Sequence, residues 1–107
     1  MKLLTIIIFS GDRFAIKKLL DDLVELSNNQ MDVAIIEWTE KPDILKKKKI
    51  LYKNYKNKIK NFKIIYQFGN WEYKYTKFIN TFNSKYVLVV GDDDRLKKKI
   101  LVKYLDT

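Results

Sequence analysis

Three consecutive aspartates, Asp92, Asp93 and Asp94, are the strongest sign of chemistry in this sequence. They follow Gly91 and the apolar run Tyr86–Val90, which has the pattern of a strand buried on both faces. Ligands of open α/β sheets bind at the carboxyl ends of strands, so these carboxylates stand where a site is expected. Carboxylate oxygens suit Mg²⁺ or Mn²⁺, and such an ion often holds substrate phosphates as well. The sequence therefore predicts a metal site formed by the three aspartates.

The same acids also suit a helix N-terminus, where carboxylates accept backbone N–H groups and favour the helix dipole. That role is compatible with a metal site. Two further polar clusters follow apolar runs: Ser10–Arg13 follows Leu3–Phe9, and Glu37–Thr39 follows Val33–Ile36. Because the carboxyl ends of parallel strands meet at one edge of a sheet, all three clusters are expected around one cleft.

Apolar runs alternate with stretches of helical periodicity along the chain. In the first such stretch, Ile16, Leu19, Leu20 and Leu23 fall at i, i+3, i+4 and i+7, which predicts an amphipathic helix. The predicted order is strand Leu3–Phe9, helix Phe14–Leu26, strand Asp32–Trp38, helix Asp43–Lys60, strand Phe62–Phe68, helix Trp71–Phe82, strand Tyr86–Val90 and helix Arg95–Leu105. This alternation predicts an α/β fold, a three-layer α/β/α sandwich with a mainly parallel sheet.

Several details of the elements are also predicted. Ser10 or Asp12 is a candidate cap for the first helix, and Pro42 suits the first turn of the second. Lys63 interrupts the third strand, which favours an edge position. In the second helix a buried face is expected, with the lysine run opposite it in water. That face is marked by Leu45, Tyr52, Tyr55 and Ile59.

Composition narrows the chemistry further. The chain has no histidine and no cysteine, which excludes an imidazole general base, a thiol nucleophile, disulfides and His or Cys metal ligands. Lys and Arg total 22 against 13 Asp and Glu, a net charge of +9, with lysine runs at Lys46–Lys49 and Lys97–Lys99. Such a charge attracts nucleic acid, anionic lipid headgroups or phosphorylated ligands, although solvated helix faces give the same composition.

Together these features resemble the nucleotide-binding half of a family-2 glycosyltransferase with the GT-A fold, over all 107 residues. The turn Phe9–Arg13 matches the turn after the family's first strand. Glu37 stands where an acidic residue reads the nucleotide base, and Tyr86–Asp94 matches a DxD-type motif. The resemblance implies a nucleotide-diphosphate sugar donor and a Mn²⁺ or Mg²⁺ cofactor. It implies nucleotide contacts from Ser10, Asp12, Arg13, Glu37, Trp38 and Asp92, and metal ligands from Asp92, Asp93 and Asp94.

Two points within the motifs stay open. Gly11 replaces an aromatic residue that often stacks on the base in the family, and Trp38 is a candidate for that role. The register of the acidic motif is ambiguous, since Asp92 with Asp94 makes a literal DxD, whereas aligning Gly91 with the first motif position makes Asp93 the metal ligand.

The resemblance further implies a hexosyltransferase acting on a saccharide or lipid-linked acceptor, in the cytoplasm or peripheral to an anionic membrane. In relatives the catalytic base lies beyond the acidic motif, and here only Asp106 follows it. We therefore expect a single domain, incomplete at its C-terminus and inactive alone, with no catalytic residue assigned. The alternatives are a non-catalytic metal- or phosphate-binding α/β domain, and a small basic nucleic-acid-binding protein using Lys46–Lys49 with Tyr52 and Tyr55.

Overall fold

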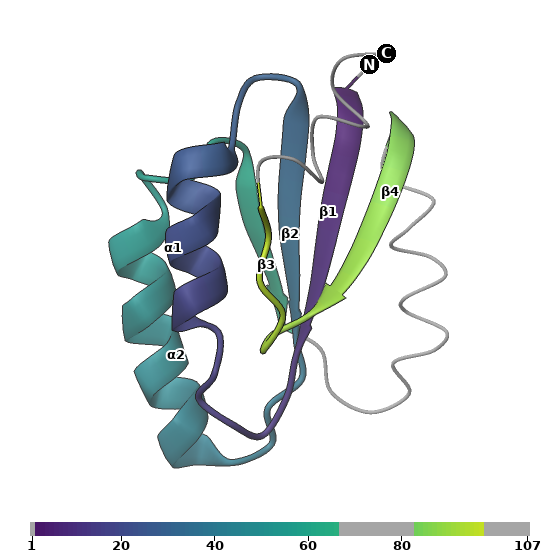
Figure 1. Ribbon diagram of the computed structural model, residues 1–107. Coiled ribbons are helices and arrows are strands. Elements are labelled where there is room, and N and C mark those ends of the chain that lie inside the picture. Colours follow the sequence, from purple (N-terminus) through teal and green to yellow (C-terminus); the bar gives the residue numbers. More distant parts are fainter. Residues whose placement is uncertain (1, 67–82, 98–107) are drawn as a thin grey trace.

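The computed structural model of the chain describes residues 2–66 and 83–97, which form one sheet covered by two helices (Figure 1). The elements are β1 Lys2–Ser10, α1 Lys17–Leu26, β2 Met31–Glu37, α2 Pro42–Tyr55, β3 Phe62–Tyr66 and β4 Ser84–Gly91. The helix predicted at Trp71–Phe82 lies outside the described residues. So does most of the one predicted at Arg95–Leu105, whose described part, 95–97, is not helical.

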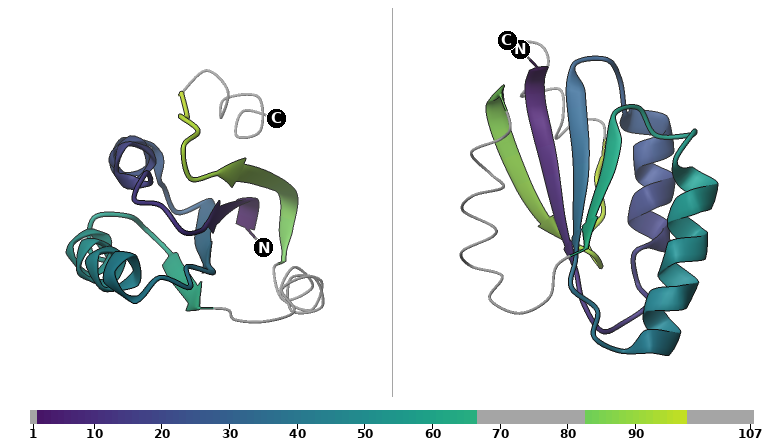
Figure 2. Two further views of the ribbon diagram at one scale, coloured as in Figure 1. Left: turned by 90° about the horizontal axis from the view of Figure 1, so that it is seen from below. Right: turned by 180° about the vertical axis from the view of Figure 1, so that it is seen from behind.

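All four strands of the sheet are parallel, in the order β3-β2-β1-β4. The predicted α/β fold with a parallel sheet is therefore confirmed. Helices α1 and α2 lie side by side on one face of the sheet (Figure 2). The third layer of the predicted sandwich rests on the helix Trp71–Phe82, outside the described residues.

The outer strands differ from the two central ones. β3 is at one edge, as Lys63 indicated, and β4 is at the other. The prediction that Tyr86–Val90 is buried on both faces is wrong, because Val87 and Val89 are 45% and 47% exposed. Only one face of β4, carrying Tyr86, Leu88 and Val90, packs against the hydrophobic core.

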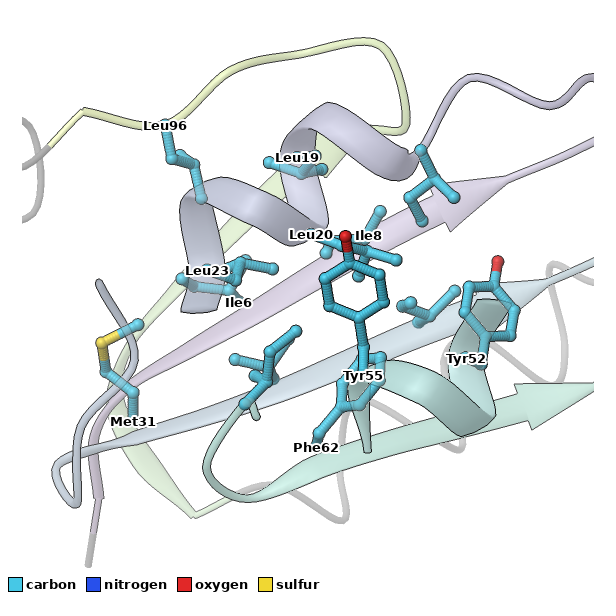
Figure 3. Packing of buried hydrophobic residues seen from close by; sticks show 14 of the residues in the cluster. Ile6, Ile8, Leu19, Leu20, Leu23, Met31, Tyr52, Tyr55, Phe62 and Leu96 are labelled. Carbon is cyan, nitrogen blue, oxygen red and sulfur yellow. The ribbon is translucent and has the colours of Figure 1, made fainter. Parts of the chain in front are cut away.

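The core lies between the helices and the central strands (Figure 3). Ile6 and Ile8 of β1 face Leu20 and Leu23 of α1, and all four side chains are completely buried. Each contributes about 1.5–3 kcal/mol of burial free energy. From α2, Tyr52 reaches the same core. This packing fixes the strand ends that carry the polar clusters.

Helix boundaries differ from the sequence expectation at two points. α1 begins at Lys17, and its N-cap is Ile16, whose side chain forms no capping hydrogen bond, so capping by Ser10 or Asp12 is wrong. α2 starts at Pro42 as predicted but ends at Tyr55 rather than near Lys60. The chain then reaches β3 through Asn61, whose φ of 53° is a left-handed conformation that asparagine tolerates.

None of the helices in the described ranges is both long and apolar enough to cross a bilayer.

Candidate functional site

The three predicted polar clusters do meet at one edge of the sheet. Ser10 at the end of β1 is in register with Glu37 at the end of β2, and Phe9 is in register with Gly91 at the end of β4. A cleft of about 430 Å³, within the range of ligand pockets, opens at these ends. It is lined by Phe9, Gly11, Asp12, Arg13, Trp38, Gly91 and Asp92.

Arg13 joins two of the predicted metal ligands. Its Nη2 lies 3.0 Å from Asp92 Oδ1 and 3.3 Å from Asp93 Oδ2. The side chain of Arg13 is 60% exposed, whereas that of Asp92 is only 4% exposed. The hydrogen bond to Asp92 and the charges of both acids raise the pKa of Arg13. Two carboxylates thus share one cationic group, and of these three residues Arg13 and Asp92 line the cleft.

Asp94 has a different role from its neighbours. Its Oδ2 accepts a hydrogen bond from the Gly91 N–H at 2.6 Å, and its own N–H donates to the Gly91 carbonyl at 3.2 Å. The aspartate therefore closes a tight turn after β4. Within residues 2–66 and 83–97 no group of three or more acidic side chains is placed to hold a metal ion. Asp92 and Asp93, rather than Asp92 and Asp94, contact the same cationic group, Arg13.

The donor set of Asp92 and Asp93 fits a divalent ion in part. Their oxygens converge on one nitrogen of Arg13, which marks a position where two carboxylates can share a cation. Mg²⁺ is commonly held by one or two carboxylates together with substrate phosphates and water, so two suffice.

Trp38 lines the cleft together with Asp92, and this tryptophan is 42% exposed. The ring packs on Gly11, at which a Cβ would be 2.7 Å from Cη2 of the indole. Asp12 Oδ1 accepts a 2.6 Å hydrogen bond from the Glu40 N–H, which ties the loop after β1 to the loop after β2. The flat ring is therefore held between two connected loops.

A buried polar cluster lies beneath the cleft. Glu37 and Lys48 are both completely buried, with Nζ 3.3 Å from Oε2. Tyr52 donates a 2.5 Å hydrogen bond to the other carboxylate oxygen, and Thr39 donates its backbone N–H to Oε2 at 3.0 Å. Burial, together with the Glu37 carboxylate, raises the pKa of Tyr52. Both oxygens of Glu37 are thus engaged inside the protein.

The predicted nucleotide contacts therefore separate into two groups. Asp12, Arg13, Trp38 and Asp92 line the cleft. Ser10 and Glu37 are completely buried beneath it.

Sequence reasoning missed Lys48, which it placed in water with the rest of the lysine run. The spacing held a signal, because Lys48 fits the same helical face as Leu45, Tyr52 and Tyr55, three residues after the first of them. A buried face assigned from this spacing alone would include Lys48. Its charge concealed this, since lysine is almost never fully buried unless it is paired.

A second missed contact fixes the segment after the aspartates. Arg95 donates two 2.8 Å hydrogen bonds to Asp22 of α1, and the Leu96 N–H donates to the same carboxylate at 3.0 Å. The hydrogen bonds from Arg95 lower the pKa of Asp22. The acidic turn is therefore anchored at Asp92 on one side and at Arg95 on the other.

The fold itself occurs in a known enzyme. The chain matches the crystal structure of residues 1–349 of S. aureus TarS with a TM-score of 0.75 and 20% sequence identity. TarS is a GT-A glycosyltransferase, and the match is to its N-terminal part. This chain has a GT-A fold. The match covers 99% of the chain but 32% of the TarS chain, so the likeness concerns the fold of that part.

The resemblance seen in the sequence is thereby confirmed at the level of the fold. No protein-family model matches the sequence, and no curated protein does.

Proposed function

We propose that this chain is the donor-binding domain of a glycosyltransferase and that it holds a nucleotide-diphosphate sugar in the cleft at the ends of β1, β2 and β4. One observation carries the proposal. Asp92 and Asp93 both contact one nitrogen of Arg13, and Arg13 and Asp92 line the same cleft as the half-exposed Trp38. A base-sized aromatic surface beside an oxygen site for a cation is the combination that a nucleoside diphosphate requires.

Each residue of the cleft has a distinct role in this proposal. Trp38 stacks on the base, since an aromatic ring accepts the flat face of any base. Arg13, which is largely exposed, pairs with a phosphate group. Asp92 and Asp93 hold Mn²⁺ or Mg²⁺. A bound ion of this kind supplies stabilisation of the negative charge that develops on the departing diphosphate.

Glu37 takes a different role from the base contact expected of it. Its carboxylate is buried, and both oxygens are occupied by Lys48, Thr39 and Tyr52. To read a base, it would have to leave these partners and expose the buried charge of Lys48. We therefore assign contact with the base to Trp38, and to Glu37 the support of the loop below it.

The acceptor side of the reaction is proposed on the resemblance alone. A saccharide or lipid-linked acceptor suits a glycosyltransferase, and we expect no sugar transfer from residues 1–107 by themselves. The nucleic-acid alternative loses its main support, because Tyr52 and Tyr55, its expected stacking residues, are buried in the core. A non-catalytic metal- or phosphate-binding domain stays the nearest alternative.

A basic groove favours the predicted contact with an anionic membrane. Lys49 and Lys53 of α2 and Lys56, the residue that follows α2, lie at i, i+4 and i+7 and border a hollow also lined by apolar residues of β3. Lys63 adds a fourth ammonium from the strand, and Lys49 lies over the half-exposed ring of Tyr66, 5.2 Å from its centre. Ammonium groups around an apolar floor suit lipid headgroups, so we propose peripheral binding there.

Titration calorimetry tests the donor site directly. The wild-type chain is titrated with UDP, GDP and ADP, each with and without Mn²⁺, and then with sugar nucleotides that carry the nucleotide that binds. We expect Mn²⁺-dependent binding of one nucleotide that Asp93→Asn weakens by about 10-fold or more. Asp43→Asn, an exposed acid in the first turn of α2, is the matched control. Binding that ignores Mn²⁺, or none at all in a folded chain, would exclude the donor site. Binding of the nucleotide with rejection of every sugar nucleotide would favour the non-catalytic alternative.

A further inference from the structure

Lys48 stands apart from the other lysines of the described chain because its side chain is completely buried. It rises from α2 toward the carboxyl ends of β1 and β2. There its Nζ donates to Ser10 Oγ at 2.8 Å, to Thr39 Oγ1 at 2.9 Å and to the carbonyl of Gly11. The ammonium therefore touches both loops that shape the cleft, although Lys48 does not line it.

The distances argue against a role limited to balancing the charge of Glu37. An ammonium–carboxylate hydrogen bond is ordinarily about 2.7–2.9 Å long. Here Nζ lies 3.3 Å from Oε2 of Glu37, whereas its bonds to Ser10 and Thr39 are shorter. The three protons of the ammonium are directed mainly at uncharged oxygens of the loops. The carboxylate supplies the compensating charge that lets a cation be buried at all.

Ser10 connects Lys48 to Asp92, one of the predicted metal ligands. Because Lys48 donates to Ser10 Oγ, the hydroxyl proton of Ser10 is left to donate, and it does so to Asp92 Oδ2 at 3.2 Å. Asp92 Oδ1 in turn accepts from Arg13. Asp92 therefore accepts hydrogen bonds from both sides, from the buried chain that begins at Lys48 and from Arg13 in the cleft.

The contact of Lys48 with Gly11 also affects the position of the Trp38 ring. The Gly11 carbonyl accepts from Lys48 Nζ and from the Thr39 hydroxyl at once. These bonds hold the glycine backbone where the Trp38 ring covers it. A small movement of Gly11 changes the surface on which that ring rests.

We propose that Lys48 is a positioning residue of the nucleotide-binding cleft. Its ammonium holds Gly11 beneath Trp38 and orients the Ser10 hydroxyl toward Asp92, so one buried cation sets both the base-stacking surface and the metal-binding carboxylate. This proposal deepens the proposed donor site and rests on it for its effect on nucleotide affinity. Its effect on the geometry of Trp38 is independent of any ligand.

A double variant separates positioning from charge balance. Lys48→Met alone leaves the Glu37 carboxylate buried without its partner and is expected to destabilise the fold. Glu37→Gln with Lys48→Met removes both charges and keeps an acceptor for Tyr52, so stability should largely return. If Lys48 only balances charge, the double variant should also have the wild-type geometry of the cleft. If it positions the loops, the cleft stays altered. Lys47→Met, an exposed neighbour on α2, is the control for lost charge.

Two measurements are made on each variant in a Trp71→Phe background, which leaves Trp38 as the only tryptophan. One is acrylamide quenching of Trp38 fluorescence without ligand, and the other is calorimetry with UDP and Mn²⁺. For the double variant we expect altered quenching and an affinity lowered by about 10-fold or more, with the control unchanged. Wild-type quenching and affinity in the folded double variant would overturn the proposal.

The remaining outcomes are also decisive. If the wild-type chain binds no nucleotide, the donor site fails, and quenching of Trp38 still decides whether Lys48 positions the loop. If the double variant does not fold, Ser10→Ala replaces it, because that change breaks the link to Asp92 and leaves the buried ion pair intact. Weaker Mn²⁺-dependent UDP binding by Ser10→Ala supports the proposal, and unchanged binding contradicts it.

Discussion

Gly11 and Trp38 are in contact so close that no other residue fits at position 11 while the indole keeps its place. A Cβ on Gly11 would lie 2.7 Å from Cη2 and 2.8 Å from Cε2 of the ring. The need for glycine here is steric, since the ring occupies the volume of the missing side chain. Gly11 stands where the resemblance to the GT-A pattern leads us to expect an aromatic residue. The ring of Trp38, from the neighbouring strand end, covers this glycine instead.

The first prediction follows from this contact. Gly11→Ala should displace Trp38, lower the affinity for a nucleoside diphosphate and destabilise the fold by about 1–3 kcal/mol, the usual cost of overpacking. Urea unfolding measures the stability, and calorimetry measures the affinity. Trp38→Ala should itself weaken nucleotide binding by about 1–3 kcal/mol through lost stacking.

The two changes together provide the control. In a Trp38→Ala background the clash is gone, so Gly11→Ala should cost little further stability. If Gly11→Ala destabilises equally with and without the ring, the steric reading of this contact is wrong.

The sequence predicted the meeting of the polar clusters because that meeting depends only on element order. Alternating strands and helices require parallel strands, and parallel strands bring residues such as Ser10, Glu37 and Asp92 to one edge. The central strand β1 was recognised correctly for a related reason, since a strand covered on both faces is almost entirely apolar, with Thr5 the one polar residue in Leu3–Phe9.

What the sequence did not predict depends on packing between elements. An apolar run does not reveal whether both faces of a strand are covered by other parts of the protein, so the exposure of Val87 and Val89 on β4 was missed. Nor does a lysine run show which member turns inward. Lys48 is buried only because Glu37 and the loop oxygens of another part of the chain surround it.

The second prediction distinguishes the three aspartates. Asp93→Asn should remove most of the Mn²⁺-dependent part of nucleotide binding, because its exposed carboxylate contacts Arg13, whereas Asp94 closes the turn on Gly91. Asp94→Asn should retain most of that binding, since the asparagine oxygen still accepts the Gly91 N–H. Calorimetry with UDP and Mn²⁺ compares the two variants. A larger loss for Asp94→Asn than for Asp93→Asn would show that the literal pair of Asp92 and Asp94 holds the metal, and equal losses would show that all three acids do.

Asp92 is expected to matter for stability as well. Its carboxylate is buried and accepts hydrogen bonds from Ser10 and Arg13, so relief of repulsion between neighbouring acids does not dominate. Asp92→Ala leaves the Ser10 hydroxyl without this acceptor. The variant should unfold at a lower urea concentration than Asp93→Asn.

The third prediction concerns pH and the pair Asp22–Arg95. Hydrogen bonds from Arg95 and from the Leu96 N–H lower the pKa of Asp22 in the folded chain below its unfolded value of about 3.9. The folded state therefore binds fewer protons than the unfolded state, and the stabilisation is complete above that unfolded value. It is lost as the pH falls through the folded pKa.

Asp22→Asn should accordingly lower the melting temperature by a few degrees at pH 7. The difference from wild type should narrow as the pH falls below about 4, because protonation removes the same charge from the wild type. Glu25→Gln, an exposed acid on α1, is the control and should show no such convergence. A constant difference between wild type and Asp22→Asn from pH 7 to pH 2 would mean that the ion pair does not anchor this segment.

The fourth prediction concerns the basic groove between α2 and β3. Replacing Lys49, Lys53 and Lys56 together by glutamine should weaken sedimentation with vesicles of phosphatidylserine and phosphatidylcholine. Each lysine near an anionic surface contributes about 1 kcal/mol, so three correspond to roughly a 100-fold loss of affinity. Raising the salt to about 1 M shortens the Debye length to about 3 Å and should release the wild-type chain too.

Net charge alone could produce part of this effect, and a matched variant separates the two. Changing Lys17, Lys18 and Lys85 to glutamine removes the same charge from exposed positions outside the groove. If the groove is the binding surface, this second variant stays close to wild type, because its lysines do not border the apolar floor on β3. Equal losses in the two triple variants would mean that the chain is held by its overall charge. Equal retention of the wild type on neutral and anionic vesicles would exclude electrostatic membrane binding altogether.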